Sequence, residues 1–208
     1  MLRNPKLVLM AQDCLPSANY EVSGNPNASV NPAFTPCTWL NTLTGCKFLC
    51  TDNTPDANVW IMISGFRGAL VTKTTVQAIA NDTETAITWD SEINDSDEFH
   101  EGVTNPTRFT IPTGVSKVFV SASISFASNV NGIRAVYIKR NGATAVGLPY
   151  DTRSGNASGI SIGISSAVID VIAGDYFELW VKQTSGGSLN APWSAGSTTA
   201  WFSIKVVQ

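Results

Sequence analysis

The chain has 208 residues, of which 43% are hydrophobic and only 14% are charged, and its formal net charge is −3. This length suits one ordinary domain, or one domain with a smaller module. The slightly negative charge gives no electrostatic reason to expect binding to nucleic acid or to an anionic membrane. Small polar residues make up for the low charge, which suits exposed β-structure.

Residues 1–35 predict an extended anchoring arm. The pairs Asn31-Pro32 and Thr35-Pro36 interrupt any regular element, and the apolar periodicity is weak. The apolar core near the N-terminus is too short for a signal peptide, so we expect folding in a cytoplasm. An arm of this kind lies against a partner. The apolar residues that we expect to anchor it are Leu7, Val8, Leu9, Met10 and Tyr20.

Residues 36–64 predict a small three-stranded β-meander. Its expected strands are Thr38–Asn41, Cys46–Thr51 and Val59–Ile63. A meander of this size buries little surface alone, so its apolar face should be covered by the arm, the next domain or another chain.

All four cysteines, Cys14, Cys37, Cys46 and Cys50, lie in the first quarter of the chain. In an extended strand Cys46 and Cys50 lie roughly 13 Å apart, too far for a disulfide. The spacing also lacks the paired short knuckles of a zinc site. We therefore expect buried, reduced thiols that act as small hydrophobic residues, and no metal.

Residues 65–71, with Gly65 and Gly68, predict a hinge, and residues 72–208 predict a β-sandwich. About eight to ten strands at short spacing, without a convincing helix, are typical of a sandwich or jelly roll. Asn141-Gly142 predicts a two-residue hairpin turn, and Asp90–Glu101 an acidic loop. No stretch is apolar enough for a membrane-spanning helix, so we expect no membrane insertion. The expected strands are Thr72–Ala80, Thr85–Trp89, Thr107–Ile111, Lys117–Ala127, Ile133–Arg140, Ala143–Leu148, Ser158–Val171, Tyr176–Gln183 and Ala200–Val207.

Two parts of the chain resemble known families. The segments Thr38–Thr42, Phe48–Asp52 and Asn58–Ile61 resemble a short module of tail-fibre and other appendage proteins of tailed bacteriophages, and Cys50 matches a cysteine of that module. Residues 72–208 resemble the jelly-roll domains related to complement globular heads and tumour necrosis factors, as found in phage structural proteins. The residues that carry this second resemblance are Asp97–His100, Asn105–Pro112, Arg134–Gly142, Gly174-Asp175 and Trp201–Val206. Together the resemblances imply an all-β, homotrimeric virion protein.

No residue pattern predicts a catalytic site, a metal site or a cofactor. His100 is the only histidine, and no nucleophile motif frames it, so we expect a surface contact. The carboxylates of residues 90–101 could donate ligands to calcium, but they lack the spacing of a known calcium loop, which favours a solvated acidic loop.

The tryptophans predict packing surfaces. Trp180 alternates with Phe177, Leu179 and Val181, and Trp201 with Phe202 and Ile204, so one face of each strand packs in the core and the other is available to a subunit interface. Trp193 lies in a Gly/Ser/Asn loop with Asn190. Aromatic rings in such loops either pack locally or stack on sugars, which makes these two residues candidate glycan contacts.

The first hypothesis is therefore a structural virion protein, assembled in the host cytoplasm, as a tail-fibre, baseplate or head-decoration component. Its partners would be two further copies of itself and other virion proteins. The alternative is a receptor-binding lectin that attaches to a host surface polysaccharide. A depolymerase enzyme is a third hypothesis, weakened by the absence of a long repetitive solenoid and of any framed catalytic group.

Overall fold

The computed structural model describes residues 19–22, 24–30, 32, 35–41, 47–64, 67–193 and 200–207. The chain divides into two compact units, Met1–Phe66 and Arg67–Gln208. The described residues are all-β, and no helix long and apolar enough to cross a membrane occurs among them. The second unit includes the strand Gly68–Thr72, so the predicted hinge at 65–71 is wrong for its last four residues.

The small unit contains a four-stranded sheet instead of the predicted three strands. The additional strand comes from the predicted arm and pairs parallel to the next strand of the sheet. Residues that follow this strand are also hydrogen-bonded to the small unit. The Trp39 indole Nε1 donates to the Gly24 carbonyl (2.8 Å), and the Asn58 side-chain amide donates to the Ala28 carbonyl (2.6 Å). The arm prediction is therefore wrong for residues 19–22 and 24–30. In spatial order the strands are β1 (Asn19–Val22), β2 (Cys37–Asn41), β3 (Lys47–Asp52) and β4 (Val59–Ser64).

Two cysteines meet in this sheet. Cys37 on β2 is the direct cross-strand neighbour of Cys50 on β3, and both are buried. Cys50 is a free thiol, as predicted. Cys37 is disulfide-bonded, so the prediction of reduced thiols is wrong for Cys37. The rise along one extended strand excludes a Cys46–Cys50 bond within that strand, but it does not bear on Cys37, which lies on a different strand.

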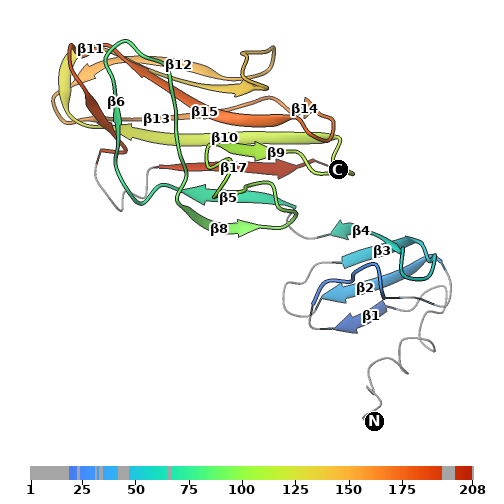
Figure 1. Ribbon diagram of the computed structural model, residues 1–208. Helices are drawn as coiled ribbons and strands as arrows, with labels where there is room; N and C mark the ends of the chain where they lie inside the picture. The colour runs from blue at the N-terminus through green and yellow to red at the C-terminus, as the bar shows by residue number, and fades with distance from the viewer. Residues whose placement is uncertain are drawn as a thin grey trace. The chain divides into compact units, whose positions relative to one another are not determined.

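The second unit is a sandwich of two antiparallel sheets, shown in Figure 1. The first sheet contains, in spatial order, β13 (Ile160–Ser165), β10 (Lys117–Phe126), β17 (Trp201–Val206), β5 (Gly68–Thr72) and β8 (Ser91–Asp95), with β14 (Ile169–Asp170) also paired to β10. The second sheet contains β12 (Tyr150–Asn156), β11 (Asn129–Arg140), β15 (Tyr176–Gln183) and β7 (Thr85–Ala86), with β9 (Arg108–Thr110) also paired to β15. A two-stranded ribbon joins β6 (Gln77–Ile79) to β16 (Leu189–Ala191).

The core lies between the two sheets, because alternate side chains of each strand face inward. On β15, Phe177, Leu179 and Val181 are fully buried, and on β17, Phe202 and Ile204 are fully buried. At the centre, the ring of Phe202 stacks on Phe109 at 4.5 Å and on Trp89 at 5.7 Å between centroids. The packed aromatic rings hold the sheets together and fix the outward face of β17.

Several element predictions in this unit are wrong. After Thr72, the predicted strand Thr72–Ala80 is a strand only at β6, and the predicted strand Ser158–Val171 is divided into β13 and β14. The predicted acidic loop contains β8, an edge strand that is polar because most of its side chains meet solvent. The predicted strand Ala143–Leu148 is instead a series of turns in which Val146 is fully exposed, and the strand begins later, at Tyr150. The Asn141-Gly142 turn is confirmed, since both residues have positive φ (52° and 78°) and Arg140 and Ala143 exchange both backbone hydrogen bonds.

Candidate interaction surfaces

The outward face of the first sheet is free of charged side chains across its centre. Strand register places Ser121, Ser203 and Leu70 in one row, and Ser123, Trp201 and Thr72 in the next. All six side chains are partly buried and uncharged. We call these six residues the Trp201 face. A sheet face of this composition needs no charged partner and accepts an apolar one.

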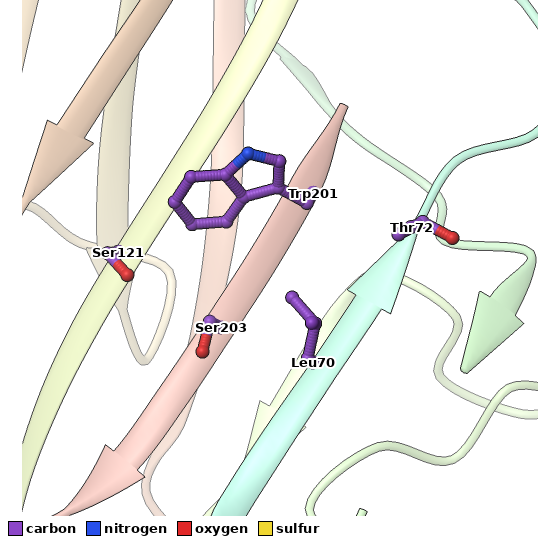
Figure 2. Close-up of a pocket in the computed structure, with 5 residues that line it drawn as sticks. All are labelled: Leu70, Thr72, Ser121, Trp201 and Ser203. Atoms are coloured by element: carbon purple, nitrogen blue, oxygen red, sulfur yellow. The ribbon is translucent and has the colours of Figure 1, made fainter. Parts of the chain in front are cut away.

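The Trp201 face is hollowed by a depression of about 500 Å³, lined by Leu70, Thr72, Ser121, Trp201 and Ser203. Figure 2 shows the Trp201 indole leaning from β17 toward β10, which carries Ser121, while Leu70 and Thr72 stand on β5. The hollow arises because the side chains of Ser121 and Ser203, next to the indole, are small. It can therefore receive side chains from a partner surface.

A second apolar surface lies where β12 and β13 form the edges of their sheets. Val146, Tyr150, Val168 and Ile172 are exposed on or next to these edge strands, with Tyr150 at 62% and Ile172 at 72%. Tyr150 is the cross-strand neighbour of Tyr137, which lies opposite Trp180, so its ring belongs to the outward face of the second sheet at its β12 edge. Their segments are tied together, since the Ala167 backbone N–H donates to the Gly147 carbonyl (2.9 Å) and the Arg140 guanidinium donates to the Asp170 carbonyl (2.9 Å). We call these four residues the Tyr150 edge. Grouped exposed apolar residues of this kind mark an interaction surface.

The outward face of the second sheet is different, because its tryptophan is already covered. Lys139 lies over the Trp180 ring with its Nζ 4.0 Å from the centroid, and the Trp180 indole Nε1 donates to Glu178 (3.1 Å). Arg108 pairs with Glu178 as well, at 3.2 Å. Trp180 is therefore engaged within its own sheet, and this face is a weaker candidate for a subunit interface than the Trp201 face.

Asp175 joins two of the segments that carry the complement-like resemblance. Its carboxylate accepts hydrogen bonds from the Arg140 guanidinium, from Asn141 Nδ2 (2.7 Å) and from the Ile172 backbone N–H (2.9 Å). Burial opposes ionisation of Asp175, but these donors outweigh it and lower its pKa. Gly174-Asp175 thus fixes the Asn141-Gly142 turn next to the Tyr150 edge.

The predicted acidic loop uses its carboxylates within the fold. Asp90 accepts hydrogen bonds from the backbone and side chains of Thr74 and Thr75, and Asp97 pairs with Arg67 at 3.1 Å. Burial raises the pKa of Asp90, but the threonine hydrogen bonds outweigh it and lower the pKa to about 2. In the part of the chain that the structure describes, no three His, Cys, Asp or Glu side chains converge as metal ligands would.

His100 is buried, so its prediction as a surface contact is wrong. Its Nδ1 lies 2.7 Å from Glu92 Oε1, and its Nε2 lies 3.4 Å from the Pro106 carbonyl oxygen. The ring also meets Phe109 edge to face. Both ring nitrogens of His100 thus lie next to partners in the same unit, which indicates a structural role.

Of the remaining predicted residues, Trp193 borders the Trp201 face, because its backbone N–H donates to Ser125, which follows Ser121 and Ser123 on the same face of β10. Trp193 follows β16 and is 52% exposed, and Asn190 on β16 is exposed as well. Tyr20 lies in β1, whereas Leu7, Val8, Leu9 and Met10 lie outside the described residues. The Tyr150 edge was not predicted, because the sequence near it predicted a strand at Ala143–Leu148. Leu70 was missed because Gly68 suggested a hinge.

Comparison with solved structures identifies the fold of the second unit. Murine APRIL, crystallised at pH 5.0, gives a TM-score of 0.50 at 10% identity and covers 68% of this chain and 99% of its own. The globular domain of zebrafish complement 1qA protein gives 0.46 at 14% identity, over 68% of this chain and 98% of its own. Eiger TNF from S. frugiperda gives 0.46 at 12% identity, over 69% and 93%.

No family model and no curated protein matches the chain. At identities of 14% or below, the structural similarity concerns the fold alone. The predicted all-β architecture is confirmed: the described strands of the second unit form a jelly-roll sandwich, and its fold is similar to that of murine APRIL.

Proposed function

We propose that the protein is a homotrimeric structural component of a tailed-phage virion, which acts by association and not by catalysis. The observation that carries the trimer is the Trp201 face, an uncharged and hollowed sheet surface on a chain that also carries an exposed apolar edge. The resemblance of residues 38–61 to phage appendage modules supports the virion location.

The contact joins the two apolar surfaces. The Tyr150 edge of one copy packs on the Trp201 face of the next, so that exposed Tyr150 and Ile172 leave water and the depression is filled. Because the two surfaces differ, the contact is heterologous and is complete only when it closes into a ring. β13 is the edge strand of the first sheet and is part of the Tyr150 edge region, so the two surfaces of the contact adjoin on one copy. Three copies complete the ring that the fold resemblance implies.

Attachment to the particle falls to the N-terminal part of the chain. Leu7, Val8, Leu9 and Met10 are costly to expose, and at roughly 25 cal/mol per Å² their burial on a partner offsets several kcal/mol of ordering entropy. Within the small unit, Val59 and Ile61 on edge strand β4 are also exposed, at 46% and 45%. An apolar edge strand is a ready site for pairing with another protein. The jelly roll would then project outward.

The test is decoration of particles that lack the native protein, followed by electron microscopy with an antibody against the jelly roll. The full chain should label the particles at fixed positions. A truncated protein that begins at Asn19 keeps β1 and should remain soluble and trimeric, but it should not label particles. If the truncated protein labels them as densely as the full chain does, attachment does not depend on residues 1–18. If neither protein labels any particle, the virion location is wrong.

A further inference from the structure

We propose that the loop surface around Trp193 binds a neutral sugar unit of a surface polysaccharide. Trp193 is 52% exposed, which is unusual for the largest apolar side chain. Its backbone N–H donates to the Ser125 hydroxyl at 3.0 Å, and Ser125 on β10 is 3% exposed. The exposed ring is therefore attached to a buried part of the sandwich, which fixes its position.

One face of the indole is supported by a glycine. Gly159 has a φ of +74°, and a Cβ placed on it would lie 3.0 Å from Cε3 and 3.3 Å from Cδ2 of Trp193. That Cβ would also lie 2.8 Å from the Phe126 carbonyl oxygen, so a larger residue does not fit. The ring thus rests on the Gly159 backbone and presents its remaining surface to solvent.

The turn that carries Gly159 is held by its own hydrogen bonds. The Ser158 backbone N–H donates to Asn156 Oδ1 at 2.7 Å, and the Gly159 N–H donates to the Asn156 carbonyl at 3.3 Å. A ring supported in this way is ordered before a ligand arrives, so binding loses little conformational entropy.

The chemistry of the surrounding loops selects the ligand class. Residues 154–169 and 183–193 contain no Asp, Glu, Lys or Arg, and Asn156, Ser158 and Asn190 are exposed. An open aromatic ring beside amide and hydroxyl groups matches a sugar, which has C–H groups on one face and hydroxyls at its rim. A charged ligand would find no counter-charge in these two segments.

This inference goes beyond the structural role, because it gives the displayed jelly roll a target. In a trimer the site is repeated three times, so weak single contacts would add in avidity toward a repetitive polysaccharide. The sugar site and the Trp201 face use different residues, but they adjoin, since Ser125 follows Ser123 on the same face of β10. Each variant is therefore measured for both polysaccharide binding and oligomeric mass.

The test is affinity electrophoresis of the full chain in native gels that contain dextran, mannan, galactan or β-glucan, with alginate as an anionic polymer. At least one neutral polysaccharide should retard the protein, and alginate should not. Trp193→Ala should weaken the apparent affinity roughly tenfold, the size expected for one aromatic contact. Trp193→Phe should retain most of the binding because a ring remains. Trp180→Ala, on the second sheet, is the matched control and should bind as the unchanged protein does.

Three outcomes would overturn the proposal: no retardation by any of the four neutral polymers, equal retardation of Trp193→Ala, or stronger retardation by alginate. The mass of each variant in solution, measured in parallel, shows whether the trimer is retained. Loss of binding in a variant that keeps its oligomeric mass is the result that supports the sugar site.

Discussion

Replacing Trp201 by alanine should dissociate the trimer without unfolding the chain. Trp201 lies on the outward face of β17, whereas Phe202 and Ile204 fill the core, so the substitution leaves no internal cavity. If contact with a neighbour covers about 60 Å² of the indole, the hydrophobic contribution is about 25 cal/mol per Å². The substitution then removes about 1.5 kcal/mol of association free energy for each copy. Over three copies this is about 4.5 kcal/mol, or a factor of about 10³ in the association constant.

Sedimentation equilibrium at several concentrations measures this change directly, and far-ultraviolet circular dichroism checks that the fold is kept. Trp180→Ala is the comparison variant. The Trp180 ring lies on the second sheet and is covered by Lys139 of the same sheet, so its removal should weaken association far less than Trp201→Ala, even though Trp180 shares a cross-strand row with Tyr137 and Tyr150. The interface assignment would be refuted if Trp180→Ala dissociated the assembly while Trp201→Ala associated as tightly as the unchanged chain.

Three further predictions concern stability and the thiols. Phe202→Ala removes a fully buried ring that stacks on Phe109, and should lower the free energy of unfolding in urea by about 4 kcal/mol; a loss below about 1 kcal/mol would contradict the packing. The pKa of Asp90 is lowered to about 2, so its contribution to stability is present above about pH 4 and is lost as the pH falls toward 2. Asp90→Asn should lower the free energy of unfolding by about 1 kcal/mol at neutral pH, and it should abolish that acid-dependent loss of stability. If the variant and the unchanged protein show the same pH profile in acid unfolding, the role of Asp90 is contradicted. Burial raises the pKa of the Cys50 thiol, so iodoacetamide should label Cys50 only after unfolding, and Cys37 only after reduction as well; peptide mass spectrometry that finds either labelled in the folded, unreduced protein would reject this.

Local signals explain which elements the sequence predicted well. Tyr176–Gln183 is a strand with the predicted bounds, because its apolar residues alternate and many of its side chains favour strands. The Asn141-Gly142 turn was predictable since few other pairs accept two positive φ angles. Such features depend on neighbours in the chain, and the sequence displays them directly.

Contacts between distant segments account for the failures. β1 pairs parallel to β2 although its four residues carry no strong strand signal, and the disulfide of Cys37 follows from folding and not from spacing. β8 is a polar edge strand that resembles a loop in sequence. The support of Trp193 by Gly159 joins residues 34 positions apart, so the sequence suggested the exposed ring but not what holds it.

The most direct test of the central claim is the mass of the unchanged full chain in solution. Multi-angle light scattering behind size-exclusion chromatography, at micromolar concentration, should give three times the chain mass of 22.1 kDa. A single, concentration-independent species with the mass of one chain would contradict the trimer, and with it the role proposed for the Trp201 face.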